Sequence, residues 1–259
     1  MKLPGTKGAG FFWALLGVLA LLAFWQAAAL AFGSPLILPG PLLVGGEFLA
    51  LVKTRRFIDA LAYSFCRVML GIAAAAPLGI AAGIAAGLDR RAALFLKPLF
   101  TVISATPVMS VILIAFLILG QGRTPVFVAF LMIFPVMSAN TVAGIQSLDS
   151  SYRELVRVFK ISGPDTLRYL YLPGIVPFVL AGLRSSLSLC WKVVVAAEVL
   201  VQPLRSLGAG MQLAKAHLET PELFAWTAAT VLAAAFSQML LSLGVCCASR
   251  IKPYKNSRK

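Results

Sequence analysis

The sequence predicts an all-α, polytopic membrane protein with about six spanning helices. Of its 259 residues, 60% are hydrophobic and only 12% are charged, whereas a soluble domain carries roughly 25% charged residues. The apolar residues gather in six runs, each near the length of about 20 residues that a spanning helix needs. The basic residues behind the formal net charge of +14 lie between these runs and at the tail. Membrane topology therefore explains the charge, and no nucleic acid partner is expected.

The predicted spans cover residues 11–32, 68–88, 99–119, 126–145, 176–201 and 223–248. The first run follows Lys2 and Lys7 and ends among small alanines, as a secretory signal would. Its apolar core, however, exceeds the roughly 7–15 residues of a signal core, which favours a retained span. Because no repeat or linker divides the chain, residues 1–259 are expected to form one transmembrane domain.

The basic residues also predict the orientation. If the N-terminus is cytoplasmic, fourteen of the 23 Lys and Arg residues fall on the cytoplasmic side and six on the outer side, in agreement with the positive-inside rule. Both termini are thus expected in the cytoplasm. Two polar segments then lie on opposite sides: residues 33–62 as a short helix at the outer surface, and residues 150–174 as a cytoplasmic loop.

Small residues and prolines mark particular positions within the spans. Pro107 and Pro135 either kink their helices, mark backbone that lines a cavity, or have no role in transport. A stripe of small residues in the second span lets another helix approach closely. The pattern leaves open whether that helix belongs to the same chain or to a second copy. The stripe consists of Gly71, Ala75, Gly79, Gly83 and Gly87.

The sequence contains no recognisable catalytic set. It has one histidine, His217, and it lacks a nucleophile elbow, a metalloprotease motif and a phosphate-binding loop. We therefore expect no catalytic residue, metal or cofactor, and if ATP drives transport it binds to a different polypeptide. The cysteines lack the spacing of metal or disulfide sites; they are Cys66, Cys190, Cys246 and Cys247.

Three charged residues lie at apolar depth in the fifth span: Arg184, Lys192 and Glu198. At about 100° per residue they share a sector about 120° wide with Ser188 and Trp191. Because an intramembrane charge normally faces protein or water, this sector is expected to face the bundle or a water-filled pathway. Alternatively, Arg184 and Glu198 reach the two interfaces by snorkelling. Lys192 and Glu198 are too far apart around the helix to pair, so each requires a partner from another span or another copy.

The polar loop of residues 150–174 is longer than a plain connector, for which fewer than about ten residues would be enough. Its pattern predicts two helices, Tyr152–Ile161 and Thr166–Leu172, with Ser162 or Asp165 as cap of the second. A short amphipathic helix held off the membrane is suited to dock a partner protein. The apolar face of the second helix comprises Leu167, Leu170 and Tyr171.

This loop resembles the EAA loop of ATP-binding cassette (ABC) importer permeases. Glu154 stands at the glutamate of that motif, and Leu172 and Pro173 follow at the family's distance. Roughly four fifths of the chain is similar to the nitrate, sulfonate and taurine subfamily of binding-protein-dependent permeases. The segments that carry this similarity are LPGP (38–41), LAGLR (180–184), CWKVVVAAEVL (190–200) and SLGAGMQLAKAHLETPELFAW (206–226).

The resemblance implies a type I, MetI-like permease fold in a bacterial inner membrane. It implies a non-enzymatic subunit that forms a pathway for a small solute, such as a nitrate-, sulfonate- or taurine-like anion or a related small organic molecule. The implied partners are a second copy in a homodimer, two copies of a cytoplasmic ABC ATPase, an extracytoplasmic substrate-binding protein and the lipid bilayer. The residues expected to couple to the ATPase are Glu154, Arg157, Lys160, Ser162, Gly163, Asp165, Leu167, Arg168, Leu172 and Pro173. The candidates for the pathway are Arg184, Ser188, Trp191, Lys192 and Glu198.

The loop also departs from the motif. Leu155 and Val156 replace its two alanines, and Lys160 stands at the position of its usual glycine, with Gly163 three residues later. Two other classes of function fit the sequence less well. A stand-alone secondary transporter would need intramembrane acids and often an inverted repeat, but only Glu198 qualifies and no repeat is visible. A membrane enzyme would need a convergent catalytic set, which is missing.

Overall fold

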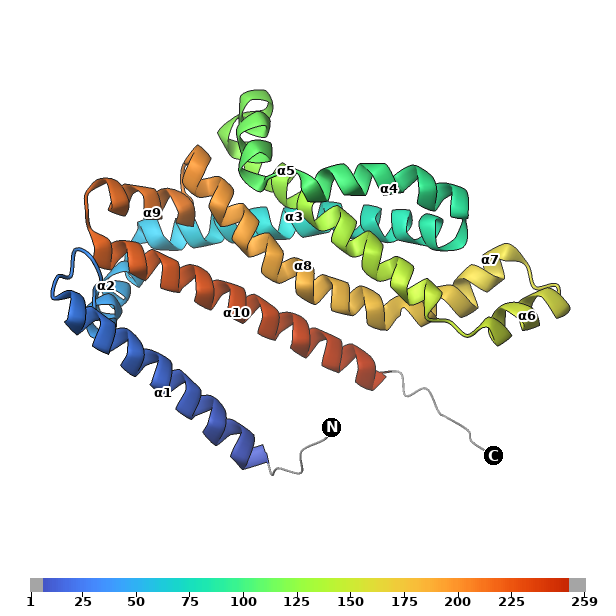
Figure 1. The fold of residues 1–259 in the computed structure, drawn as a ribbon, viewed down its shortest axis with the longest axis horizontal. Helices are drawn as coiled ribbons and strands as arrows, with labels where there is room; N and C mark the ends of the chain where they lie inside the picture. The colour runs from blue at the N-terminus through green and yellow to red at the C-terminus, as the bar shows by residue number, and fades with distance from the viewer. Residues whose placement is uncertain (1–6, 252–259) are drawn as a thin grey trace.

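The computed structural model confirms the all-α, polytopic class. It describes residues 7–251, with the side chains of residues 12–149, 151–152 and 154–245. Lys2 and the basic tail from Lys252 onward therefore lie outside the described part, as do the side chains of Lys7, Arg153 and Arg250. The elements, drawn in Figure 1, are α1 (Lys7–Phe32), α2 (Pro41–Val52), α3 (Arg55–Leu88), α4 (Arg90–Ala105), α5 (Val108–Gln146), α6 (Ser150–Val158), α7 (Gly163–Thr166), the π-helix η1 (Leu167–Tyr171), α8 (Leu172–Val201), α9 (Leu207–Ala216) and α10 (Thr220–Ile251). Five described stretches are long and apolar enough to span a bilayer: Phe12–Phe32, Arg55–Leu88, Val108–Gln146, Gly163–Val201 and Thr220–Val245.

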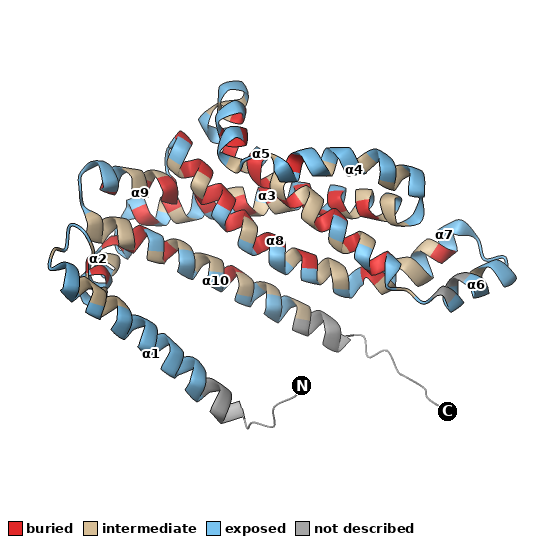
Figure 2. Ribbon diagram, viewed as in Figure 1, coloured by how far each residue is buried: buried red, intermediate tan, exposed pale blue. Residues whose placement is uncertain are grey.

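The core lies where α3, α5 and α8 pack together, and buried residues concentrate along these three helices in Figure 2. Val68 of α3, Ile133 and Met137 of α5, and Val194 of α8 are completely buried. In contrast, α1 is apolar on all sides and largely exposed. A helix of this kind requires an apolar surrounding, which a bilayer provides.

The small-residue stripe of α3 packs against α5 of the same chain, which answers the question that the pattern left open. An ideal Cβ added at Gly71 would lie 2.8 Å from the Cβ of Ala129, and one at Gly79 would lie 2.6 Å from the Cβ of Met137. At Gly83 it would lie 2.5 Å from the Cβ of Thr141 and 2.7 Å from the carbonyl oxygen of Ser138. The two backbones are thus too close for any side chain at these positions.

Gly83→Ala is therefore expected to destabilise the protein by about 1–3 kcal/mol, the usual range for overpacking a tight interface. The matched control is Gly244→Ala in α10, where a Cβ would meet nothing within 4 Å. The control should be neutral or slightly stabilising because alanine is the better helix former. Denaturant unfolding in detergent micelles measures both. Equal stability of the two variants would contradict the close packing of α3 on α5.

The third predicted span, residues 99–119, is not one continuous helix. α4 ends at Ala105, Thr106 is extended (φ −75°, ψ 128°), and α5 begins after Pro107. The residue before a proline avoids the helical region, which explains the break. α5 is interrupted again at Gly120 (φ 73°, ψ 178°), a conformation that favours glycine. Pro135, by contrast, lies inside the long second part of α5, without non-helical backbone angles.

The second predicted span, residues 68–88, begins too late. The expected short helix within residues 33–62 is α2, but α3 starts already at Arg55 and runs for 34 residues. Thr54 caps this helix by accepting a hydrogen bond from the Phe57 amide at 3.2 Å. Arg55 and Asp59 pair one turn apart at 3.2 Å. Arg55, Arg56 and Asp59, which made this segment look too polar to span, therefore lie in the first turns of a long helix that is a candidate span as a whole.

The two ends of the molecule differ in character. α6 and α7 form a protrusion at one end, beyond the ends of α5 and α8, whereas α2 and α9 lie at the opposite end (Figure 1). The C-terminal part of α1 is attached at that opposite end. There, the Trp25 indole donates to the Pro39 carbonyl at 3.1 Å and stacks on Phe224. Any device that couples the two ends must act through the long helices between them.

Candidate functional site

The protrusion is a capped, well-defined local structure. The Asp149 side chain accepts a hydrogen bond from the Ser151 amide at the start of α6. Ser162 caps α7, because its hydroxyl oxygen accepts from the Asp165 amide at 3.3 Å and also donates to the Asp165 carboxylate at 2.6 Å. Of the two predicted caps, Ser162 is thus the one used. The first helix, however, ends at Val158 instead of Ile161.

An apolar surface covers this polar protrusion. Val158 and Phe159 are 74% and 71% exposed, although both are large and hydrophobic. Exposed apolar groups that gather on one part of a surface are typical of a site of interaction with protein or membrane. We refer to this set as the apolar loop surface; it consists of Tyr152, Leu155, Val158, Phe159, Ile161 and Tyr169, all exposed.

The predicted second helix of the loop does not end at Leu172. α7 continues through η1 into α8 without a break, so Leu172 and Pro173 form the first turn of the long helix. The expected apolar face is half-buried at Leu167, Leu170 and Tyr171. A π-helical turn is rare and is frequent at functional sites. α7 is thereby joined directly to α8.

The other loop residues predicted for coupling are on the surface. The exposed residues are Glu154, Arg157, Lys160, Ser162, Gly163, Asp165, Arg168, Leu172 and Pro173. Lys160 has a left-handed backbone (φ 48°), which glycine adopts most readily. This explains why the resembling motif has a glycine there, and it means that this chain holds a strained residue at the same place. Gly163 stands in the first turn of α7 and needs no positive φ.

The predicted polar sector of α8 is divided by the structure. Arg184, Ser188 and Lys192 are exposed, whereas Trp191 and Glu198 are buried. The Trp191 indole donates to the Ser237 hydroxyl of α10 at 3.3 Å. Among the described side chains, Lys192 has no ion-pair partner. One edge of the sector therefore faces the core of the chain, and the other edge is exposed on the surface of the single copy.

Glu198 does not snorkel to the interface, because it is completely buried in an ion pair. Its partner is Arg67 of α3, whose guanidinium lies 2.8 Å from the carboxylate. The Ser64 hydroxyl lies 2.8 Å from both carboxylate oxygens, and the Gly208 amide of α9 donates to one of them at 3.3 Å. The required partner thus comes from another helix of the same chain. We refer to Ser64, Arg67 and Glu198 as the buried cluster.

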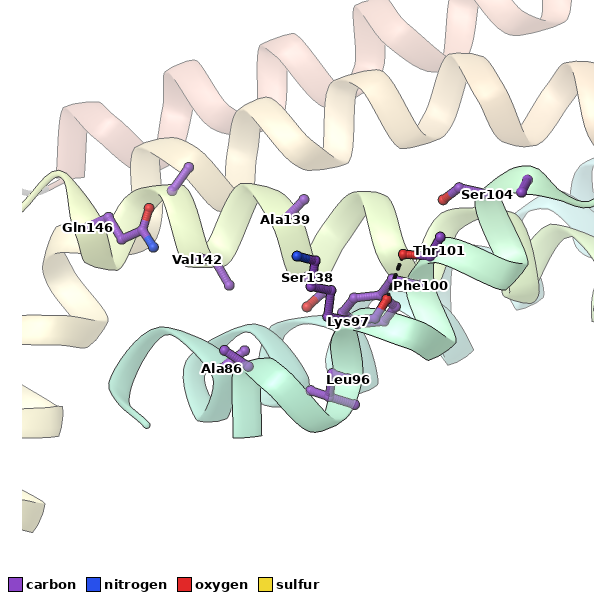
Figure 3. A pocket seen from close by; sticks show the side chains of 13 residues that line it. Ala86, Leu96, Lys97, Phe100, Thr101, Ser104, Ser138, Ala139, Val142 and Gln146 are labelled. Carbon is purple, nitrogen blue, oxygen red and sulfur yellow. Dashed lines mark hydrogen bonds between the residues drawn. The ribbon is translucent and has the colours of Figure 1, made fainter. Parts of the chain in front are cut away.

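Two hollows were not predicted from the sequence. The larger, of about 810 Å³, lies between α3, α4 and α5. Figure 3 shows Lys97 of α4 and Ser138 of α5 within it. The Thr101 hydroxyl donates to the Lys97 carbonyl at 2.9 Å, whereas the buried Ser138 hydroxyl has no hydrogen-bond partner among the described residues. Residues from three helices line this hollow, so no local spacing in the sequence could indicate it.

The second hollow, of about 560 Å³, lies at the end opposite to the protrusion, between the start of α3 and α9. Its polar lining includes Arg56, Gln202, Arg205 and Gln212. Nearby, the exposed Glu219 shares a hydrogen bond with Glu222, and this bond together with the negative charge of Glu222 raises the pKa of the Glu219 carboxyl. This end is therefore polar and bears charges of both signs.

These features define a polytopic helical membrane protein with an exposed loop between two of its long helices. Residues 75–250 match the family described as "Binding-protein-dependent transport system inner membrane component", and the chain belongs to this family. It is 32% identical to the taurine transport system permease protein TauC of Escherichia coli (strain K12), over 89% of this chain and 85% of that protein. It is 30% identical to the putative aliphatic sulfonates transport permease protein SsuC of Bacillus subtilis (strain 168), over 77% and 73% of the two chains. It is 31% identical to the nitrate import permease protein NrtB of Synechocystis sp. (strain ATCC 27184 / PCC 6803 / Kazusa), over 71% and 70%.

The expected family is thereby confirmed. The chain is the permease subunit of an ABC importer, a multi-pass protein of the inner membrane, and it is not itself an enzyme. Membership of this family implies a separate ATPase and a substrate-binding protein as partners.

Proposed function

We propose that this permease works as a homodimer, with two copies of a cytoplasmic ATPase and an extracytoplasmic binding protein, and that it imports a small anion. The named substrates of the relatives, namely taurine, aliphatic sulfonates and nitrate, each carry a compact group of anionic oxygens. The exposed cations Arg184 and Lys192 suit such a solute. Discrimination among these anions is expected to reside mainly in the binding protein.

The observation that carries the coupling mechanism is the continuity from the loop into α8. α6, the turn after it and η1 present the apolar loop surface, and α7 and η1 continue directly into the 30-residue helix α8. A groove on the ATPase that holds this surface would move α8 as a lever. ATP binding brings the two ATPases together, draws the two loops toward each other and opens the pathway outward, and hydrolysis reverses the motion.

The pathway is assigned to the exposed edge of α8, between the two copies. An ammonium group at apolar depth, such as that of Lys192, is stable only against protein or water. A second copy and a hydrated pathway provide both. Arg184 and Ser188 lie on the same exposed edge, whereas Trp191 and Glu198 support the helix from the core side.

Orientation follows from the same assignment. The protrusion must be cytoplasmic to meet the ATPase, which places the end formed by α2 and α9 outside (Figure 1). The distribution of basic residues favours the same direction. Both termini are then cytoplasmic, and residues 1–259 act as one transmembrane domain.

Reconstitution in proteoliposomes tests this function. The permease is co-expressed with its ATPase, reconstituted, and supplied with the binding protein and labelled taurine, nitrate or an alkanesulfonate. We expect uptake that requires ATP, the ATPase and the binding protein together, with one of these anions competing best. Mass spectrometry of the ligand that co-purifies with the binding protein identifies the natural solute independently. Uphill uptake by the permease alone would instead indicate a secondary transporter and would overturn the proposal.

A further inference from the structure

The loop between α8 and α9 is held in an unusual conformation. Gln202 (φ 47°, ψ 55°) and Arg205 (φ 55°) both have left-handed backbones, although neither is glycine. Strained residues of this kind persist only where the surrounding structure fixes them, and they concentrate at functional sites. The loop, residues 202–206, therefore requires an explanation for its rigidity and for its purpose.

The rigidity comes from the buried cluster beneath the loop. The Arg67 guanidinium pairs with Glu198 at 2.8 Å and reaches the carbonyl oxygens of Leu204 and Arg205 at 3.5 Å. Ser64 accepts a hydrogen bond from the Leu207 amide at 3.0 Å, immediately after the loop. Within the loop, the Ser206 hydroxyl donates to the Pro203 carbonyl at 2.9 Å. Contacts from α3, α8 and α9 thus fix the loop on its buried side.

The exposed side of the loop displays groups that are typical of protein contacts. Leu204 is 86% exposed, and Arg205 donates to the Tyr63 hydroxyl at 3.3 Å while its guanidinium lies over the Tyr63 ring. Arg205 has no carboxylate partner among the described side chains. Arginine and tyrosine are enriched at the energetic centres of interfaces, and a loop already fixed in its bound shape loses little entropy on docking.

The hollow beside the loop completes the surface. It has about 560 Å³ and brings Arg56 and Arg205 to one lining together with Asp59. The negative charge of Asp59 is already matched by Arg55. Arg56 pairs with Glu222 at 3.8 Å and lies over the Trp226 ring, so Arg205 is the lining cation without a carboxylate partner among the described side chains. The hollow therefore has an excess of positive charge and favours an acidic side chain from a partner.

We infer that residues 202–206 and this hollow are the docking point for the extracytoplasmic binding protein, which presents an acidic side chain to Arg205 and Arg56 and an apolar patch to Leu204. Arg67 and Glu198 act as positioning residues that hold the loop in its docking shape. The inference rests on the proposed function for one step, because the coupling protrusion at the opposite end fixes this end as the outer one (Figure 1).

The test uses the complete transporter in nanodiscs, with the purified binding protein as the ligand. We expect Arg205→Glu to weaken binding of the binding protein at least tenfold. The affinity of this variant should also depend less on salt than that of the wild type, because salt screens the charge contact that the variant has lost. Lys215→Glu is the matched control, because Lys215 is exposed at the end of α9 but does not line the hollow. This control should change the affinity less than twofold.

A second arm tests the positioning residues. Glu198→Gln should weaken binding severalfold and leave co-purification of the ATPase unchanged, because the coupling loop is at the far end. An acidic residue of the binding protein reversed to lysine should restore affinity for the Arg205→Glu variant and not for the Lys215→Glu variant.

The outcomes separate this inference from the proposed function. If the ATPase does not assemble with the wild-type permease, the proposed function fails. If it assembles and Arg205→Glu binds the binding protein as tightly as the wild type, only the docking inference is overturned. In the wild type, the affinity for the binding protein could change with the anionic lipid content of the nanodisc. If that dependence is lost in Arg205→Glu, the hollow binds lipid headgroups and the docking inference is overturned. If Arg205→Glu reduces uptake but leaves the affinity for the binding protein unchanged, the hollow binds the solute, and the docking inference is again overturned.

Discussion

Replacing Arg67 with methionine is expected to lower the free energy of unfolding by about 3–5 kcal/mol, because it leaves the Glu198 carboxylate buried without its charged partner. Glu198 is fully buried and the Arg67 side chain is only 11% exposed. The remaining donors to the carboxylate, Ser64 and the Gly208 amide, are neutral. Denaturant unfolding in mixed micelles gives the free energy directly.

A surface pair provides the control for this experiment. Arg55→Met removes the ion pair with Asp59, in which the arginine side chain is 86% exposed. An exposed pair of this kind contributes about 1 kcal/mol or less. The double variant Arg67→Met with Glu198→Met should recover part of the loss because no unpaired charge remains. An Arg67→Met variant as stable as Arg55→Met would show that water reaches the buried cluster, and the explanation of the fixed loop would then be wrong.

The buried cluster illustrates what the sequence can and cannot predict. A glutamate at apolar depth without an i+4 partner predicts a partner on another helix, and Arg67 is that partner. Its identity could not be derived, because it depends on the rotation of α3 relative to α8 and on where α3 begins. A span that starts at residue 68 puts Arg67 at its edge, whereas Arg67 lies well inside a helix that begins at Arg55.

The polar sector of α8 shows a related limit. Helical spacing correctly places Arg184, Lys192 and Glu198 within one sector, since that depends only on the backbone geometry. Spacing does not say which direction points to the core. The core boundary passes through this sector, so that Trp191 is buried and Lys192, its neighbour in the chain, is exposed.

The interrupted third span has another physical cause. Hydropathy averages side chains over a window, and glycine or proline within an apolar run changes that average little. The break before Pro107 and the positive φ of Gly120 are backbone properties. Proline alone would not have been diagnostic, because Pro77, Pro125 and Pro135 all lie inside continuous helices. The small-residue stripe, in contrast, was predicted correctly, since close approach of two helices requires small side chains at that spacing.

Phe159→Asp is expected to reduce ATP-driven uptake by a factor of about 30 or more, the equivalent of losing an interface anchor worth about 2 kcal/mol. Phe159 is 71% exposed at the end of α6 and is the largest side chain of the apolar loop surface that has no polar atom. If this surface sits in an apolar groove of the ATPase, a carboxylate there must be desolvated without a partner, which is unfavourable. The fold of the permease should be unaffected, because the side chain contributes nothing to its core.

The matched variant Phe159→Leu keeps an apolar side chain and should retain most of the uptake. Three measurements on each variant separate the causes: co-purification of the ATPase, ATP hydrolysis by the reconstituted complex, and uptake. Weak co-purification of Phe159→Asp with normal unfolding in micelles places the loss at the docking step. Normal co-purification and hydrolysis without uptake places it in the transmission from α6 through η1 to α8. Unchanged uptake in Phe159→Asp would mean that the apolar loop surface does not meet the ATPase, and that another cytoplasmic segment must transmit the force to α8.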